Sequence, residues 1–127
     1  MSLDITPLVP AGRQVIEAYG NGGFVIAGTR YIGSVIVFSE RTLAWPVAAA
    51  AQVSEGALTP LFASAPLPEI LVIGCGAGFL PAPAPLRAGL RARGLALEWM
   101  DTGAACRTFN VLLAEGRPAA AALIAVF

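Results

Sequence analysis

The sequence predicts an α/β protein in which an antiparallel β unit is joined to a Rossmann-like β-α-β-α-β half with a parallel sheet, in three layers. Short apolar runs separated by glycine-rich turns fill the first third of the chain, which is typical of antiparallel strands. Apolar strands and amphipathic helices alternate from Leu67 to Phe127, and right-handed crossovers between them make a sheet parallel. A chain of 127 residues encloses one core, so we expect a single domain over residues 1–127.

The antiparallel unit is predicted from its turns. Gly20-Asn21-Gly22-Gly23 is a strong hairpin signal between two short apolar runs. Val35 to Phe38 shows no alternation of apolar and polar residues, which favours a strand covered on both faces. A short helix is expected to begin near Ser54. An extended lead-in is expected over residues 1–12, and strands over residues 14–19, 24–27, 31–38 and 42–45.

The second half is more regular. Its expected elements are a strand over 70–73, a helix over 85–93, a strand over 95–100, a helix over 102–115 and a strand over 119–127. Leu86 and Leu90 lie four residues apart and mark the buried side of the first helix. Thr102 is placed to cap the second helix, which we expect to stop at Gly116.

The composition excludes several kinds of chemistry. The chain has no histidine and no lysine, which removes the Ser-His-Asp triad, histidine metal sites, the phosphate-loop lysine and Schiff-base lysine chemistry. The two cysteines, Cys75 and Cys106, do not form a CxxC pair. Net charge is zero and the arginines are dispersed, so no track for nucleic acid is expected. We therefore expect no metal and no cofactor, and a non-enzymatic role rather than catalysis.

High mean hydropathy raises the question of a membrane span. The longest uncharged run, Ile70 to Leu86, is broken repeatedly by glycine and proline, so no spanning helix is expected. No secretory signal is visible at the start. These features favour a cytoplasmic protein that is not integral to a membrane and that binds a protein partner through apolar surface. Val111 lies on the outward side of the last expected helix, so a homo-oligomer that forms through this residue is a further hypothesis.

Two turns should meet at the carboxyl ends of the parallel strands, where open α/β sheets bind ligands. One is Gly74-Cys75-Gly76-Ala77-Gly78 and the other is Asp101-Thr102-Gly103. Their amides and the positive end of the following helix would suit an anion. A dinucleotide site is disfavoured because Phe79 replaces the third glycine of the fingerprint and prolines follow it. The candidate binding residues are Gly74, Cys75, Gly76, Gly78, Asp101, Thr102, Cys106 and Arg107.

Three of these side chains have alternative interpretations. Asp101 is either a turn and cap residue, which we favour, or a base. Arg107 either clamps a carboxylate or phosphate, or is a solvated surface charge. Cys106 lies near a helix N-terminus, where a thiolate is favoured, but also on the apolar face of that helix, and burial is the favoured interpretation.

The run from Met100 to Arg117 resembles a family of small proteins of largely unknown function. Its mitochondrial members include NADH:ubiquinone oxidoreductase (respiratory complex I) assembly factor three, and a more distant branch contains the adipogenesis-associated domain proteins. Supporting motifs are Gly22–Ile26, Tyr31–Val35 and Pro68–Gly76, and the likeness extends from about Ile16 to Ile124. The resemblance implies a compact α/β fold and, for mitochondrial members, a role in assembling a membrane-bound respiratory enzyme. The lack of a presequence favours a bacterial cytoplasmic form.

Three functional hypotheses follow. The first is a non-enzymatic interaction or assembly factor whose partners include respiratory-complex subunits or membrane-insertion factors. The second is a small-ligand or anion-binding domain, either a binding protein or an enzyme. It would use the crevice between the Gly74–Gly78 and Asp101–Arg107 turns. The third is thiol redox chemistry through Cys106.

Overall fold

The structure, a computed structural model, describes residues 12–127, and these residues form two β-sheets. The smaller sheet is antiparallel and consists of β1 (Ile16–Gly20), β2 (Gly23–Ile26) and β3 (Thr29–Ile32). The larger sheet has the order β5-β4-β8-β6-β7. Its strands are β4 (Val35–Val37), β5 (Thr42–Ala44), β6 (Ile70–Gly74), β7 (Ala96–Met100) and β8 (Ala119–Leu123). The lead-in expected before Gly12 lies outside the described residues.

The larger sheet is mixed. Strand β6 pairs in parallel with both β7 and β8, whereas β4 pairs antiparallel with β8 and with β5. The predicted α/β class, with an antiparallel unit joined to a Rossmann-like half, is confirmed. One detail differs: the β4–β5 hairpin, which we had expected in the antiparallel unit, extends the sheet of the Rossmann-like half.

The prediction of one strand over residues 31–38 was wrong. The strand breaks at Gly33 and Ser34, where the chain leaves the smaller sheet after β3 and enters the larger sheet as β4. Gly33 has φ +87°, a backbone conformation that other residues rarely adopt, so a single continuous strand cannot pass through it. The burial predicted for β4 on both faces is correct, because all three of its side chains are fully buried.

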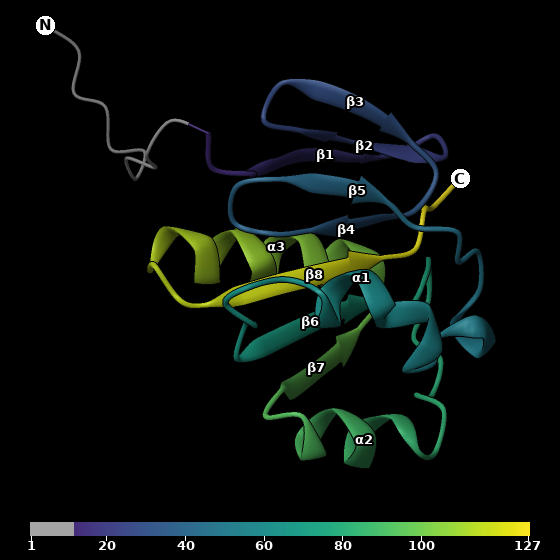
Figure 1. Cartoon of the computed structure of the whole chain (residues 1–127). Helices are drawn as coiled ribbons and strands as arrows, with labels where there is room; N and C mark the ends of the chain where they lie inside the picture. The colour runs from purple at the N-terminus through teal and green to yellow at the C-terminus, as the bar shows by residue number, and fades with distance from the viewer. Residues whose placement is uncertain (1–11) are drawn as a thin grey trace, which may run out of the picture.

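The helices lie on both faces of the larger sheet (Figure 1). They are two 3-10 turns, Ala50–Gln52 and Gly56–Leu58, and the α-helices α1 (Thr59–Phe62), α2 (Leu86–Ala92) and α3 (Thr102–Ala114). The chain passes from β6 through α2 to β7 on one side, then through α3 to β8 on the other side of β6. Right-handed crossovers in opposite directions place α2 and α3 on opposite faces.

Two hydrophobic clusters confirm this layering. Leu71 and Ile73 of β6 pack with Leu86 and Leu90 of α2 on one face of the sheet. Val72, between them in sequence, packs on the other face with residues of α3 and of the smaller sheet. The members of this second cluster include Phe24, Ile26, Ala105, Cys106 and Phe109. The larger sheet is therefore the middle of three layers, with α3 and the smaller sheet on one side and α1 and α2 on the other.

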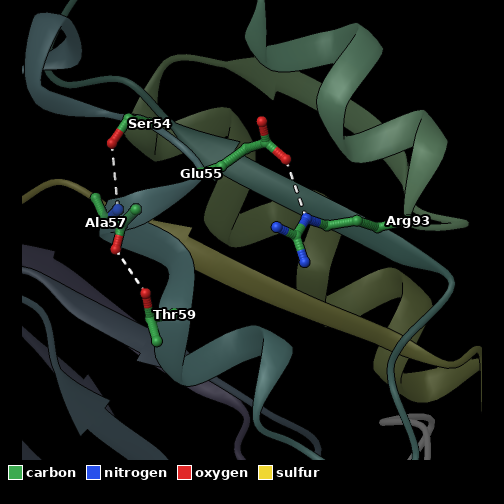
Figure 2. A network of polar contacts seen from close by, with 6 residues as sticks. Ser54, Glu55, Ala57, Thr59 and Arg93 are labelled. Atoms are coloured by element: carbon green, nitrogen blue, oxygen red, sulfur yellow. Dashed lines mark hydrogen bonds and ion pairs between the residues drawn. The ribbon is translucent and has the colours of Figure 1, made fainter.

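Polar contacts tie the segment before α1 to α2 (Figure 2). The Ser54 hydroxyl accepts a hydrogen bond from the Ala57 amide at 3.2 Å, and Arg93, just after α2, forms an ion pair with Glu55 at 3.0 Å. The Arg93 guanidinium also lies 3.9 Å from the ring centre of Phe62. Because these contacts are solvent-exposed, they add little to the free energy of unfolding, and their main effect is to position the segment before α1 against the end of α2.

The uncharged run from Ile70 to Leu86 forms β6 and the loop that leads to α2, which begins at Leu86, and not a single long helix. Within residues 12–127, no helix has both the length and the apolar character needed to cross a membrane.

Candidate functional site

The two predicted turns lie side by side at the carboxyl ends of β6 and β7. The Cys75 amide donates to the Met100 carbonyl at 2.8 Å, and the Thr102 amide donates to the Gly76 carbonyl at 2.9 Å. The parallel pairing of β6 with β7 therefore continues past Gly74 and Met100 into the turns. Five of the candidate residues meet here: Gly74, Cys75, Gly76, Asp101 and Thr102.

Thr102 fills the space between the ends of β6 and β8. Its side chain is fully buried, and its hydroxyl donates to the Ile124 carbonyl at 2.8 Å and accepts from the Gly76 amide at 3.1 Å. The Ile124 amide in turn donates to the Gly74 carbonyl at 3.0 Å. The crevice in which open α/β sheets bind ligands is thus closed by a side chain of the protein itself.

Gly74 is required by this closure. A Cβ at Gly74 would lie 2.8 Å from the Thr102 Cα and 2.9 Å from the Thr102 hydroxyl oxygen, both closer than real contacts allow. The glycine of β6 therefore serves the approach of α3 to the sheet. This explains the glycine without requiring a bound phosphate.

Asp101, and not Thr102, caps α3. Asp101 has an extended backbone, and its carboxylate accepts a hydrogen bond from the Ala104 amide at 3.0 Å. Thr102 is already helical and its hydroxyl is engaged elsewhere, so the prediction of a Thr102 cap was wrong. The carboxylate adds negative charge at the helix N-terminus, which opposes a bound anion there.

The two cysteines are buried free thiols. Burial raises the pKa of Cys106 to about 12, an effect that the neighbouring Arg107 guanidinium reduces only in part. The thiolate is therefore negligible at neutral pH, and Cys106 belongs to the core beside Phe109. Cys75 Sγ donates to the Gly78 carbonyl at 3.4 Å and accepts from the Leu80 amide at 3.5 Å, so the hydrogen bonds of its side chain stay within its own loop. Arg107 lies exposed on the outer side of α3.

A pocket opens beside the first turn, away from Asp101, Thr102 and Arg107. It has a volume of about 610 Å³ and no charged side chain in its wall. Its lining consists of residues 48–50, 75–80 and 124–127. Phe79, at its rim, is 69% exposed. Of the candidate residues, only Cys75, Gly76 and Gly78 line it. The predicted set therefore does not form one site, since Cys106 lies in the core and Arg107 on the surface.

Asn110 was not selected from the sequence, although it lies within the run that carries the family resemblance. Its side chain on α3 binds both backbone groups of Ile16 at the start of β1. A polar residue on a helix otherwise packed by apolar side chains was the available signal. Its role became visible only when β1 was seen to lie against α3.

Within residues 12–127, no group of three or more cysteine, aspartate or glutamate side chains is placed to hold a metal ion. The buried side-chain nitrogen and oxygen atoms of this part of the chain all have hydrogen-bond partners.

Residues 16–124 match a family model described as "Protein of unknown function (DUF498/DUF598)". The chain belongs to this family. The match covers both sheets and all three α-helices, so the whole described fold is the family domain.

Curated relatives of this DUF498/DUF598 protein include two vertebrate proteins named NADH dehydrogenase [ubiquinone] 1 alpha subcomplex assembly factor 3. The human protein is 34% identical over 114 residues, which is 90% of this chain and 62% of the relative. The Danio rerio protein is 39% identical over 123 residues, 97% of this chain and 71% of the relative. The match therefore spans less than two thirds of the human relative's length.

Solved structures with the same fold include two bacterial proteins. A Bartonella henselae protein described as an outer membrane protein is 39% identical, with a TM-score of 0.82 over 91% of this chain and 98% of its own. A Bordetella pertussis protein described as an Mth938-like domain is 26% identical, with a TM-score of 0.81 over 98% of this chain and 92% of its own. These likenesses show that the DUF498/DUF598 chain shares its α/β fold with bacterial proteins of known structure.

Proposed function

We propose that this chain is a non-enzymatic protein-interaction or assembly factor linked to the biogenesis of a membrane-bound respiratory complex. The observation that carries the proposal is its identity of 34–39%, over at least 86% of the chain, to proteins named as assembly factors of NADH dehydrogenase. Its partners would be subunits of that complex or factors that insert them into the membrane. We place this role in the bacterial cytoplasm, in line with the expectation from the sequence.

The surface supports a binding role. Among residues 12–127, six large hydrophobic side chains are exposed: Tyr19, Ile32, Phe79, Leu80, Val111 and Phe127. Phe79 and Leu80 stand together at the rim of the apolar pocket, where a partner side chain would be shielded from water. Exposed aromatic and aliphatic side chains around a concave apolar centre are typical of protein-binding surfaces.

The experiment removes the gene from the source organism and measures assembled NADH dehydrogenase on native gels. We expect the complete complex to decrease and subassemblies to accumulate, and wild-type protein to restore it. A Phe79→Ser/Leu80→Ser variant should restore less than an Arg117→Gln control, which changes an exposed residue away from the pocket. An unchanged complex, together with no respiratory subunit bound to the tagged protein, would exclude this role.

The small-ligand alternative has support only from the apolar pocket. Because no side chain in its wall is charged, we expect a ligand there to be apolar and not an anion. Its test is titration of the protein with small apolar molecules while the amide signals of residues 75–80 are followed by NMR.

The thiol redox alternative is opposed by the raised pKa of Cys106. A homo-oligomer through the exposed Val111 stays a prediction, for which the test is mass in solution.

A further inference from the structure

The larger sheet ends at β7, and among residues 12–127 no strand pairs with its outer edge. The Ala96 amide donates to the Glu69 carbonyl at 2.8 Å, and the Met100 carbonyl accepts from the Cys75 amide at 2.8 Å. Alternation along the strand then directs the backbone groups of residues 96, 98 and 100 toward β6. The amides and carbonyls of Leu97 and Trp99 point outward, toward the place of a sixth strand.

A groove lined by two arginines runs beside this edge. It encloses about 350 Å³ between α2 and β7, and its walls are Arg87, Arg91 and residues 94–97. Arg87 and Arg91 lie one helical turn apart on α2. No acidic side chain lines the groove, and within residues 12–127 the one ion pair joins Arg93 to Glu55, elsewhere on the surface.

Arg87 also covers the edge. Its Nη1 donates to the outward carbonyl of Leu97 at 3.0 Å, which occupies a group that would otherwise recruit another strand. A cation placed over an unpaired strand edge is a common protection against uncontrolled pairing. Because Arg87 already uses the Leu97 carbonyl, an incoming strand that pairs with this carbonyl has to supply Arg87 with another hydrogen-bond acceptor.

We propose that the outer edge of β7 and the arginine groove bind an extended acidic segment of a partner protein, which adds to the sheet as a sixth strand. The inference rests on the proposed role as a protein-interaction factor and names a second docking surface, separate from the apolar pocket beside Phe79 and Leu80. A backbone amide of the partner replaces Arg87 at the Leu97 carbonyl, and the released guanidinium binds a carboxylate of the same segment. Every polar group keeps a hydrogen bond, and the guanidinium gains a charge-assisted one.

The choice of an acidic peptide follows from two separate features. The two guanidinium groups without a neighbouring carboxylate select negative charge. The outward backbone groups of Leu97 and Trp99 select a peptide backbone, which a nucleic acid does not offer. Because only these two residues point outward, the added strand makes few hydrogen bonds, and binding should be weak and reversible.

The experiment titrates the isotopically labelled full chain with the blocked peptide Thr-Val-Glu-Val-Glu-Val-Thr. Matched peptides carry Gln or Lys in place of Glu, and a short oligothymidylate serves as a non-peptide anion. We expect the acidic peptide to bind at about 1 mM or tighter, to shift the Leu97 and Trp99 amide signals and to slow their hydrogen exchange. It should bind about tenfold more tightly than the Gln peptide, and the double variant Arg87→Gln/Arg91→Gln should lose this preference. The variant Arg117→Gln should keep it.

Three results would overturn the inference: unchanged Leu97 and Trp99 signals, equal binding of the acidic and Gln peptides, or tighter binding of the oligothymidylate. Amide spectra of the free variants establish that they are folded. If the peptide fails while gene deletion still impairs assembly, the β7 edge is rejected and the assembly role stands. If the peptide binds as expected while deletion leaves the complex unchanged and no respiratory subunit binds the tagged protein, the edge is a protein-binding surface and the assembly role is rejected.

Discussion

The side-chain amide of Asn110 makes both of its hydrogen bonds with the backbone of Ile16, which is 94 residues earlier in the chain. Asn110 Nδ2 donates to the Ile16 carbonyl at 2.8 Å, and Oδ1 accepts from the Ile16 amide at 2.9 Å. Asn110 thus imitates the backbone of a neighbouring strand. It pairs the outer edge of β1 and ties the smaller sheet to α3.

Replacing Asn110 by Ala should destabilise the fold by about 2 kcal/mol, because two partly buried backbone groups lose their partner. Replacing it by Asp should be at least as costly, since a carboxylate oxygen would face the Ile16 carbonyl. Chemical denaturation followed by circular dichroism measures both free energies of unfolding. Equal stability of Asn110→Ala and wild type would show that β1 is held without this amide.

Thr102 offers a test of the closed crevice. Thr102→Val keeps the shape of the side chain but removes the hydroxyl, so the Gly76 amide and the Ile124 carbonyl lose their hydrogen-bond partner. We expect the free energy of unfolding to fall by about 2 kcal/mol. Thr102→Ser keeps the hydroxyl and should retain more stability than Thr102→Val. If the crevice instead served a ligand, Thr102→Val would reduce ligand binding with little effect on thermal unfolding.

Gly74 and Gly78 form a matched pair in the same loop region. Gly74→Ala forces a Cβ to within 2.8 Å of the Thr102 Cα and should destabilise the protein by about 2 kcal/mol or more. A Cβ at Gly78 would meet nothing within 4 Å, so Gly78→Ala should change stability by less than about 0.5 kcal/mol. The melting temperatures of the two variants compare them directly. A larger loss at Gly78 would mean that this glycine contacts something other than the described chain.

The pKa of Cys106 gives a prediction about reactivity and pH. In a Cys75→Ala variant, Cys106 should react with a thiol reagent at neutral pH only after denaturation. The folded pKa of about 12 lies above the thiol's ordinary value of 9.0, so the unfolded thiol ionises first. Stability from Cys106 is then complete below pH 9.0 and is lost as pH rises toward about 12. A Cys106→Ala variant should not show this loss of stability at high pH. Rapid labelling of Cys106 in the native protein would contradict the burial of its thiol.

The sequence predicted the elements better than it predicted their partners. The β-α-β-α-β half was correct because apolar strands, helical spacing and glycine stops agree locally, as at Leu86, Leu90 and Gly94. The turns at Gly76 and Thr102 were expected to meet because parallel strands present their carboxyl ends together. The change of sheet at Gly33 was not predicted, since a glycine within an apolar run indicates a bend but not which strand the chain pairs with next.

The candidate site was harder to predict. Turn glycines suggest either phosphate binding or close packing, and only the distance from Gly74 to Thr102 distinguishes the two. Asp101 and Thr102 are both good capping residues, and the choice between them depends on whether the Ile124 carbonyl lies within reach of the Thr102 hydroxyl. Asn110 and Arg87 act on backbone groups distant in sequence, so no local pattern marks their roles.

Strand β8 lies between β4 and β6 in the larger sheet, although it follows both of them in the sequence. A nascent chain that has released everything before Ala119 still has β4 and β6 without the strand that joins them, and both expose unpaired edges. The larger sheet is therefore completed only when Ala119–Leu123 become available, and its two halves cannot pair with each other before that. A stop codon a few residues before Ala119 would leave two half-sheets prone to aggregation rather than a shortened working protein.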